Sequence, residues 1–387
     1  MSVLTRVQRL WLDVHLWLGA ALFIPFAVLG LTGSVLVWRA SADRILAPHH
    51  YEVSAGAPAP LAADLVNARA AFGEDFVVAS LRAPAQDGDP MVAQARARAR
   101  PAPGERPRTR SAWIDPATGR VLDVGPARSG LLGLSHDLHG SLMFPGAGRQ
   151  VVGWLGLFML ASSLTGIWLW WPRGALLAGL RWKRGPRTTY NLHHLTGFWI
   201  AIPLAVLAAT GAFISFPRTS AALTGMFVET RAPEARAPGG GGPPPLTQAH
   251  LDVDTVVRAA LAAAPDDARF VSVTLPTRGR DGAAANWRVQ VRSAGQDAMT
   301  SISVADDTGE ASVRGERAAP SAGENVARLM RRLHDGDDLP ITWRVIITIA
   351  GFAPALLGVT GVVMWLRRQS ARRAIQRRYA GAAQAGE

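Results

Sequence analysis

The chain has 387 residues, of which 49% are hydrophobic, and a formal net charge of +12 at pH 7. This length is sufficient for two or three domains. The absence of cysteine excludes disulfides, thiolate-held iron–sulfur clusters and covalently attached c-type haem.

Four apolar stretches each exceed the roughly 18 residues that indicate a membrane-spanning helix. They lie at about 14–38, 151–171, 195–216 and 341–366. The first stretch is followed by Ala40-Ser41-Ala42, which resembles a signal-peptide cleavage site, but its apolar core is longer than that of a signal peptide. We therefore predict an α-helical membrane protein with a retained first helix and four spans in the lipid bilayer.

The positive charge lies in three short segments. Residues 1–13, 172–191 and 367–387 together hold 13 Arg and Lys against 2 acidic residues. The long segments 39–150 and 217–340 hold 27 Arg against 27 Asp and Glu, so their charges cancel. Because cytoplasmic loops carry an excess of Lys and Arg, we expect both termini and the 172–191 loop in the cytoplasm. The charge predicts topology and gives no reason to expect a nucleic-acid partner.

Both long segments have the pattern of a small α+β module. The first has a helical pattern at 61–72, strand patterns at 76–81, 112–114 and 120–124, and a turn at Asp115-Pro-Ala-Thr-Gly119. The Arg- and Pro-rich stretch 96–110 is expected to be a mobile loop.

The second segment follows the same plan. A Gly- and Pro-rich linker at 239–245 precedes a predicted helix at 251–263, strands at 269–275 and 286–292, and a strand pair around Asp306-Asp-Thr-Gly309. The linker is no phosphate-binding loop, because no strand precedes it and no Lys-Ser/Thr pair follows it.

Two constant shifts relate the halves of the chain. A shift of 178 residues carries His15, Gly19, Pro25 and Thr32-Gly33 onto His193, Gly197, Pro203 and Thr210-Gly211. A shift of 195 residues carries Leu138-His139 and Thr165-Gly166 onto Leu333-His334 and Thr360-Gly361. We interpret the chain as a tandem duplication of helix, outside α+β module and helix, with two parallel repeats related by a pseudo-two-fold axis along the membrane normal.

The predicted order along the chain is transmembrane helix 1 (10–38), outside module 1 (39–148), helix 2 (149–171), a basic cytoplasmic loop (172–191), helix 3 (192–216), outside module 2 (217–340), helix 4 (341–366) and a basic cytoplasmic tail (367–387).

Six of the nine histidines form two groups at opposite ends of the predicted spans. His15, His193 and His194 lie at the cytoplasmic ends of helices 1 and 3, whereas His136, His139 and His334 lie at the outside ends of helices 2 and 4. Under the pseudo-two-fold axis, His15 faces His193 and His139 faces His334. The remaining three, His49, His50 and His250, have no counterpart under the shifts, and we interpret them as solvated surface residues.

Paired histidines between apolar helices are typical of a b-type haem with two axial imidazoles. Zinc is less suitable, because it usually takes three or four ligands and helices 1 and 3 carry no acidic residue within the span. The alternative to a haem site is that each histidine caps a helix or lies in the headgroup layer.

Other residues could support a bound haem. The second ring nitrogen of a ligating histidine donates to a carbonyl or carboxylate, and Asp13 and Asp137 are candidate acceptors. Arginines near the outside helix ends are candidate partners for haem propionates: Arg39, Arg149, Arg331 and Arg332.

Several motifs resemble the PepSY-associated transmembrane family. They are the repeated Thr-Gly helix ends, His15-Leu-Trp-Leu-Gly19, His136-Asp-Leu-His-Gly140, Leu164-Thr-Gly-Ile-Trp-Leu-Trp-Trp-Pro-Arg173 and His193-His-Leu-Thr-Gly197. The outside modules with the Asp-Pro-Ala-Thr-Gly turn resemble PepSY domains, although the second turn has drifted from that motif. The resemblance implies haem binding and reduction of ferric siderophores at the periplasmic face of the bacterial inner membrane. The family's histidines correspond to His15, His139, His193 and His334, with His136 and His194 as further candidates.

The leading hypothesis is therefore a haem-containing oxidoreductase with two bis-His haem b groups. It would pass electrons across the inner membrane to a ferric siderophore or other ferric chelate. The chain has no dinucleotide-binding fingerprint, so a quinol or a redox partner would be the electron donor. The alternative is a non-enzymatic PepSY protein that binds or regulates a periplasmic protease or acts as a sensor. A transporter ranks third, because only Pro25, Pro203 and Pro354 hint at broken helices.

Overall fold

The computed structural model describes residues 3–99, 108–171, 185–228, 245–246, 248–277, 285–293, 299–313 and 321–384. The chain forms two compact units. The helical unit comprises 1–39, 134–230 and 322–387, and the sheet unit comprises 40–133 and 231–321. Most of the predicted linker at 239–245, most of the basic loop 172–191 and most of the predicted mobile loop lie outside the described residues.

Four helices of the helical unit are long and apolar enough to cross a membrane. They are α1 (Val3–Leu36), α5 (Gly148–Trp170), α7 (Thr188–Ser215) and α11 (Ile341–Gln384). Each covers nearly all of one predicted apolar stretch. A helix satisfies its backbone polar groups internally, as the bilayer requires. The chain is a multi-pass membrane protein.

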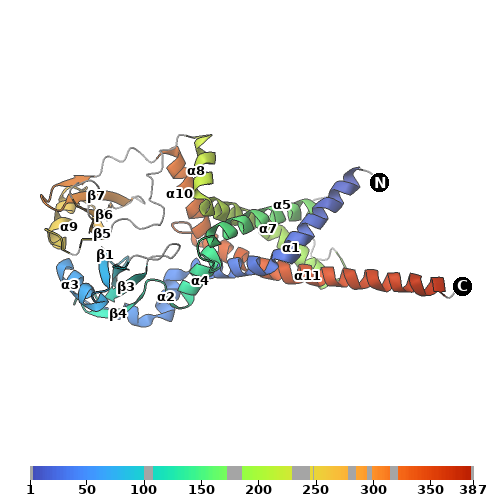
Figure 1. The fold of residues 1–387 in the computed structure, drawn as a ribbon, viewed down its shortest axis with the longest axis horizontal. Coiled ribbons are helices and arrows are strands. Elements are labelled where there is room, and N and C mark those ends of the chain that lie inside the picture. Colours follow the sequence, from blue (N-terminus) through green and yellow to red (C-terminus); the bar gives the residue numbers. More distant parts are fainter. Residues whose placement is uncertain are drawn as a thin grey trace. The chain divides into compact units, whose positions relative to one another are not determined.

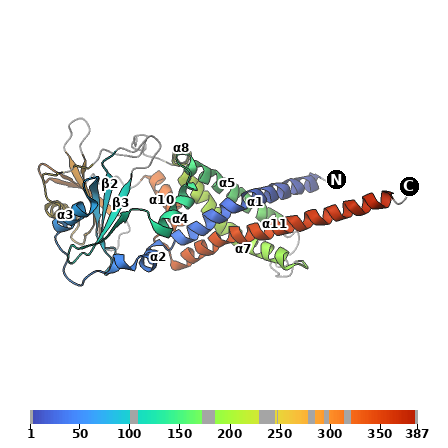
Figure 2. The same cartoon turned by 60° about the horizontal axis from the view of Figure 1, so that its bottom comes forward.

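The four spans pack chiefly as two pairs, α1 with α11 and α5 with α7 (Figures 1 and 2). At the α1–α11 crossing, a side chain on Gly30 or Gly351 would collide with the backbone of the opposite helix. The Ser34 hydroxyl donates to the Thr348 carbonyl across the same crossing at 2.9 Å. Small residues and interhelical hydrogen bonds of this kind hold membrane helices together.

Short helices flank the spans. They are α4 (Gly130–Ser141) before α5, α8 (Pro217–Gly225) after α7, and α10 (Ala322–Asp335) before α11. The sequence interpretation placed His136, His139 and His334 at the ends of the spans themselves, but these histidines lie on α4 and α10. The chain breaks after each short helix because Leu142 and Met143 adopt positive φ, and because Gly336, also at positive φ, follows α10.

The sheet unit contains eight antiparallel strands in the order β4-β3-β2-β1-β5-β6-β7-β8. The first segment supplies β1 (Phe76–Arg82), β2 (Met91–Ala97), β3 (Thr109–Ile114) and β4 (Val121–Pro126). The second supplies β5 (Arg269–Thr277), β6 (Asn286–Arg292), β7 (Met299–Ala305) and β8 (Ala311–Val313). The β2 strand was not predicted from the sequence, and its last two residues fell within the predicted Arg-rich loop.

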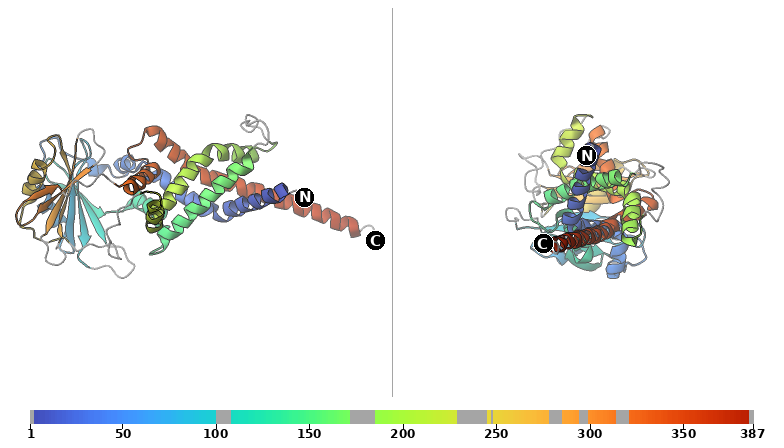
Figure 3. Two further views of the ribbon diagram at one scale, coloured as in Figure 1. Left: turned by 90° about the horizontal axis from the view of Figure 1, so that it is seen from above. Right: turned by 90° about the vertical axis from the view of Figure 1, so that its right-hand side faces the viewer.

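The two segments share one sheet, although the sequence predicted a separate module in each. β1 pairs with β5, with Ser80 opposite Thr274 and Leu81 opposite Val273. Figure 3 shows the strands of the two segments side by side. Pairing these strands removes two sheet edges that separate modules would expose.

One hydrophobic core joins the segments on the helix-covered face of the sheet. Helices α3 (Leu61–Phe72) and α9 (Val253–Ala262) pack there (Figure 1). Leu65 and Phe72 from α3, Val256 from α9 and Trp287 from β6 belong to a single buried cluster. Each such side chain contributes about 1.5–3 kcal/mol on burial. At the β4 edge, the chain forms α2 (Arg39–Leu46) and the 3₁₀ helix η1 (Pro48–Tyr51).

Candidate functional site

His15 of α1 and His193 of α7 lie side by side in the helical unit. Their ring centroids are 6.4 Å apart and their planes are nearly perpendicular. The His15 Nδ1 lies 3.0 Å from the Ser162 carbonyl oxygen and 3.2 Å from the Thr165 hydroxyl, both on α5. The His193 Nδ1 lies 2.9 Å from the Thr360 hydroxyl on α11. This pair therefore draws on all four spans.

His139 of α4 and His334 of α10 form a second pair, with ring centroids 5.9 Å apart. The His139 Nδ1 is 2.8 Å from the Leu29 carbonyl oxygen of α1, and the Thr32 hydroxyl lies beside it. The His334 Nδ1 is 3.1 Å from both the Leu207 carbonyl oxygen and the Thr210 hydroxyl of α7. Burial lowers the pKa of His139, and burial together with the nearby His139 lowers the pKa of His334 to about 4. Both imidazoles are neutral at pH 7.

Every one of these four histidines docks on a Thr-Gly dipeptide of another helix. The glycine leaves room for the ring edge, since a Cβ added there would lie 2.8–3.4 Å from the Cε1 atom of the docked histidine. The four dipeptides are Thr32-Gly33 (His139), Thr165-Gly166 (His15), Thr210-Gly211 (His334) and Thr360-Gly361 (His193). In the sequence these dipeptides stood out only as repeated positions and as motifs of the family resemblance.

The docking contacts determine the tautomer of the histidines. Each threonine hydroxyl donates its own proton to the carbonyl four residues earlier in its helix. It can then only accept at the histidine, and the neighbouring carbonyls are acceptors as well. Nδ1 must therefore carry the ring proton in all four histidines, which leaves the Nε2 lone pair available to a metal.

The ring separations fit a metal held between two imidazoles. With metal–nitrogen bonds of about 2.0–2.1 Å, two rings on opposite sides of one ion have centroids about 6.4 Å apart. The observed values are 6.4 and 5.9 Å. Neither pair has a third ligand, because the only group of three or more possible metal ligands within the described part of the chain lies elsewhere. Two axial ligands suit haem iron better than a bare zinc ion.

A cavity of about 400 Å³ adjoins the His15–His193 pair. Gly19 and Gly197, one helical turn after the two histidines, line it, and a Cβ on Gly19 would meet no atom within 4 Å. Trp170 and Phe198 stack with centroids 3.9 Å apart in its wall. This apolar space beside paired imidazoles suits a flat apolar macrocycle such as haem.

The two additional candidates differ in position. His194 lines the same cavity and its ring lies 4.1 Å from that of Tyr190, whereas His136 is exposed on α4. The His194 ring centroid lies 6.3 Å from that of His193, about as close as that of His15, so His194 stays a candidate ligand at this pair. The aspartates suggested as Nδ1 partners, Asp13 and Asp137, are not the acceptors found for His15 and His139, which are helix carbonyls and threonines.

The arginines suggested as propionate partners lie at the α4 and α10 end of the helical unit. Arg149 donates to the Ile214 carbonyl, and Arg332 donates to the Asp338 carbonyl. Arg39 and Arg331 are exposed. All four remain predictions as partners of an anionic group.

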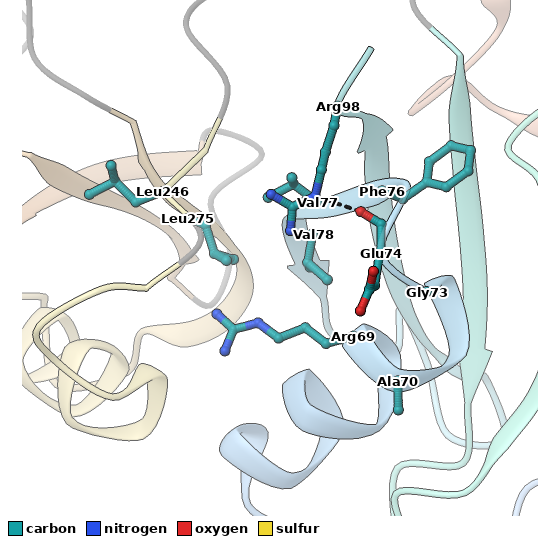
Figure 4. Close-up of a pocket in the computed structure, with 10 residues that line it drawn as sticks. All are labelled: Arg69, Ala70, Gly73, Glu74, Phe76, Val77, Val78, Arg98, Leu246 and Leu275. Atoms are coloured by element: carbon teal, nitrogen blue, oxygen red, sulfur yellow. Dashed lines mark hydrogen bonds between the residues drawn. The ribbon is translucent and has the colours of Figure 1, made fainter.

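The sheet unit has a pocket of about 320 Å³ between β1 and the chain near Leu246 and Leu275. Figure 4 shows the Arg69 and Arg98 side chains extending toward these two leucines. The Arg98 Nε donates to the Glu74 carbonyl at 2.6 Å, and burial lowers the pKa of Arg69. Two guanidinium groups and the Glu74 carboxylate therefore lie beside apolar walls in this pocket.

His49 and His50, interpreted from sequence as solvated residues, lie beside Asp123. His50 is buried, and its Nε2 is 3.0 Å from the Asp123 carboxylate. Sequence offered little signal for this cluster, because Asp123 lies 73 residues beyond His50.

The four spans, the paired histidines and the joined sheet define a multi-pass membrane protein with an attached α+β unit. The chain belongs to the PepSY-associated TM region family, whose profile matches residues 12–368. The resemblance seen in the sequence motifs is thereby confirmed. A comparison with curated proteins finds no match to the chain.

Proposed function

We propose that this chain is a haem-containing oxidoreductase of the bacterial inner membrane that passes electrons across the bilayer to a ferric siderophore or another ferric chelate, in iron acquisition. One observation carries the proposal: two pairs of histidines lie side by side with Nδ1 satisfied by Thr-Gly docking sites. That arrangement leaves one lone pair on each ring directed away from its docking helix.

A b-type haem at each pair would supply one-electron transfer. His15 and His193 would hold one group, and His139 and His334 would hold the other. The threonine hydroxyls and helix carbonyls hold the rings in the ligating tautomer, as outer-shell partners do at metal sites. His15 and Leu29, which docks His139, are separated by about 21 Å of helix rise, so the two pairs lie at different depths.

The pocket with Arg69 and Arg98 supports an anionic chelate as the substrate. The guanidinium groups would bind carboxylate or other anionic oxygens of the chelate, and the apolar wall would bind its carbon skeleton. A quinol or a redox partner would supply the electrons.

The proposal also includes the repeat symmetry and the membrane topology of the chain. The equivalent docking of His15 and His193, and of His139 and His334, supports two parallel repeats. The distribution of Arg and Lys supports cytoplasmic termini, with the sheet unit on the periplasmic side.

The test is the haem content of the full-length protein purified in detergent from haem-replete cells. We expect two b-type haems per chain, and loss of about one in each of His15→Ala and His334→Ala, because each removes an axial ligand from a different pair. The exposed His250 of the sheet unit gives the control, since His250→Ala should retain both.

Activity requires a second measurement in proteoliposomes. With a reductant enclosed and a ferric chelate outside, the wild type should produce Fe(II), and both ligand variants should lose most of this activity. A colourless wild type would contradict the proposal and would favour the alternative of a PepSY protein that regulates a periplasmic protease or acts as a sensor.

A further inference from the structure

A cluster of histidine and carboxylate groups lies at the β4 edge of the sheet unit. His49 and His50 are on η1, Asp123 is on β4, and Asp43 is on α2. One ligand atom from each of His49, His50 and Asp123 lies within 4.8 Å of the other two. None of these residues belongs to the paired histidines of the helical unit.

The distances between these ligand atoms resemble those at an occupied metal site. The Asp123 carboxylate oxygen lies 3.0 Å from the His50 Nε2 and 3.5 Å from the His49 Nε2. In a tetrahedral site with bonds of about 2.0–2.1 Å, neighbouring ligand atoms are about 3.3 Å apart. An ion bound by these atoms would need only small movements of two side chains that are about half exposed, His49 and Asp123.

His50 is held in place as a metal ligand would be. Its side chain is only 8% exposed and stacks on Trp113, with ring centroids 3.7 Å apart and an interplanar angle of 9°. Its Nδ1 is buried without a hydrogen-bond partner, and the nearest carboxylate oxygen, that of Asp43, is 3.9 Å away.

Metal binding would satisfy this nitrogen. In the tautomer whose Nε2–H donates to Asp123, the His50 Nδ1 atom is a hydrogen-bond acceptor, and no donor in the described part of the chain lies within reach of it. If Nε2 instead binds a metal, the ring proton moves to Nδ1, where it faces the Asp43 carboxylate. A ligating histidine that donates its other N–H to a carboxylate is the usual outer-shell arrangement. The Tyr51 hydroxyl already fixes Asp43 through a 2.8 Å hydrogen bond.

We propose that His49, His50 and Asp123 bind a divalent first-row transition-metal ion, with Asp43 orienting His50. Two imidazoles and a carboxylate suit Zn²⁺, Fe²⁺ or Cu²⁺ and disfavour Ca²⁺ and Mg²⁺, which take oxygen ligands. The bound ion joins η1 to the edge strand β4 and so stabilises the 40–52 segment on the sheet. This proposal stands independently of the haem proposal.

The experiment is a calorimetric titration of Zn²⁺ into the full-length, chelator-treated protein in detergent. We expect one site whose dissociation constant rises at least about tenfold in His49→Ala and in Asp123→Asn, since each removes one of three protein ligands. His250→Ala, which removes an exposed histidine of the same unit, should leave the site unchanged. The His15→Ala variant should also retain it, which separates this site from the histidine pairs of the helical unit.

A second readout guards against misfolded variants. Zn²⁺ should raise the melting temperature of the wild type and have no such effect on His49→Ala, whose melting temperature without metal should match the wild type because this side chain is exposed. Absence of binding by the wild type, or equal binding by the wild type and His49→Ala, would overturn the proposal.

Discussion

Four histidines of the helical unit have the same local environment, and that environment selects which ring nitrogen is available. A threonine in a helix normally donates its hydroxyl proton to a carbonyl of the preceding turn, and these threonines do so. The hydroxyl oxygen then accepts from the docked imidazole. A glycine after the threonine lets the ring lie against the helix, so the dipeptide sets both the tautomer and the position of the ring.

Gly19 tests whether the cavity beside His15 holds a group as large as haem. Gly19→Leu should lower the haem content by about one per chain while leaving His15 in place, because the added side chain fills open space beside the ring. Pyridine haemochrome analysis measures the loss. Ala21→Leu adds the same bulk to an exposed position of α1 and should bind both haems; equal haem content in the two variants would argue against haem in this cavity.

Asp64 of α3 gives the sheet unit a specific pH dependence. The residue is fully buried, and neither carboxylate oxygen has a hydrogen-bond partner. Burial, then the charges of Asp254 and Asp115, raise its pKa to about 7. Because the pKa of Asp64 is higher in the folded state than in the unfolded state, the folded state binds the proton more tightly. The free energy of unfolding should fall by up to about 1.4 kcal/mol per pH unit between about pH 4 and pH 7.

The corresponding variant is Asp64→Asn, which is neutral at every pH. It should melt at a higher temperature than the wild type at pH 8 and lose most of the decline between pH 5 and pH 8. Thermal denaturation of the full chain followed by tryptophan fluorescence measures both. The exposed Asp266→Asn should behave as the wild type; a decline in Asp64→Asn as steep as in the wild type would exclude this role.

At the scale of elements, the two outside segments are joined by more than apolar contact. The N-cap residue of α3 is Pro60, which offers no capping side chain. Asp254 of α9 takes this role from the other segment, accepting from the Leu61 and Ala62 amides at 2.9 and 3.0 Å. A carboxylate there satisfies orphan amides and complements the helix dipole. The cap and the β1–β5 pairing make the segments one cooperative unit.

A disulfide can test the β1–β5 pairing, because the chain has no native cysteine. Ser80 and Thr274 are directly opposite in the antiparallel register, where Cα atoms are about 4.5–5.5 Å apart, within the range of a disulfide. The Ser80→Cys, Thr274→Cys double variant should therefore crosslink on mild oxidation, detected as a mobility shift on non-reducing gels. Pairing Ser80→Cys with Gln290→Cys on β6 places β5 between the thiols and should not crosslink.

At the scale of the whole molecule, the distribution of charge predicts the side of the membrane on which each unit lies. Ser312 of β8 and Ser370 of α11 are exposed, and Ser370 lies in the Arg-rich tail. In spheroplasts, an impermeant maleimide should label Ser312→Cys and leave Ser370→Cys unlabelled until the membrane is permeabilised. The opposite labelling pattern would reverse the proposed topology.

Much of the fold was predictable because the membrane restricts the options. An apolar stretch of more than about 18 residues in a bilayer can satisfy its backbone only as a helix, so composition alone located α1, α5, α7 and α11. The strands β1, β5 and β6 were also predicted, since β-branched residues alternate between turn signals. The short helices α4 and α10 were missed, although the largely polar segment 336–340 separates α10 from α11.

The sequence by itself singled out His15, His139, His193 and His334, because two constant shifts repeat them together with the Thr-Gly dipeptides. Only the tertiary structure decided that each dipeptide receives a histidine, since the donors and acceptors involved are more than 100 residues apart. The same holds for the joined sheet and for the His49, His50 and Asp123 cluster. Long-range contacts of this kind leave no local periodicity in a sequence, so folding alone brings these groups together.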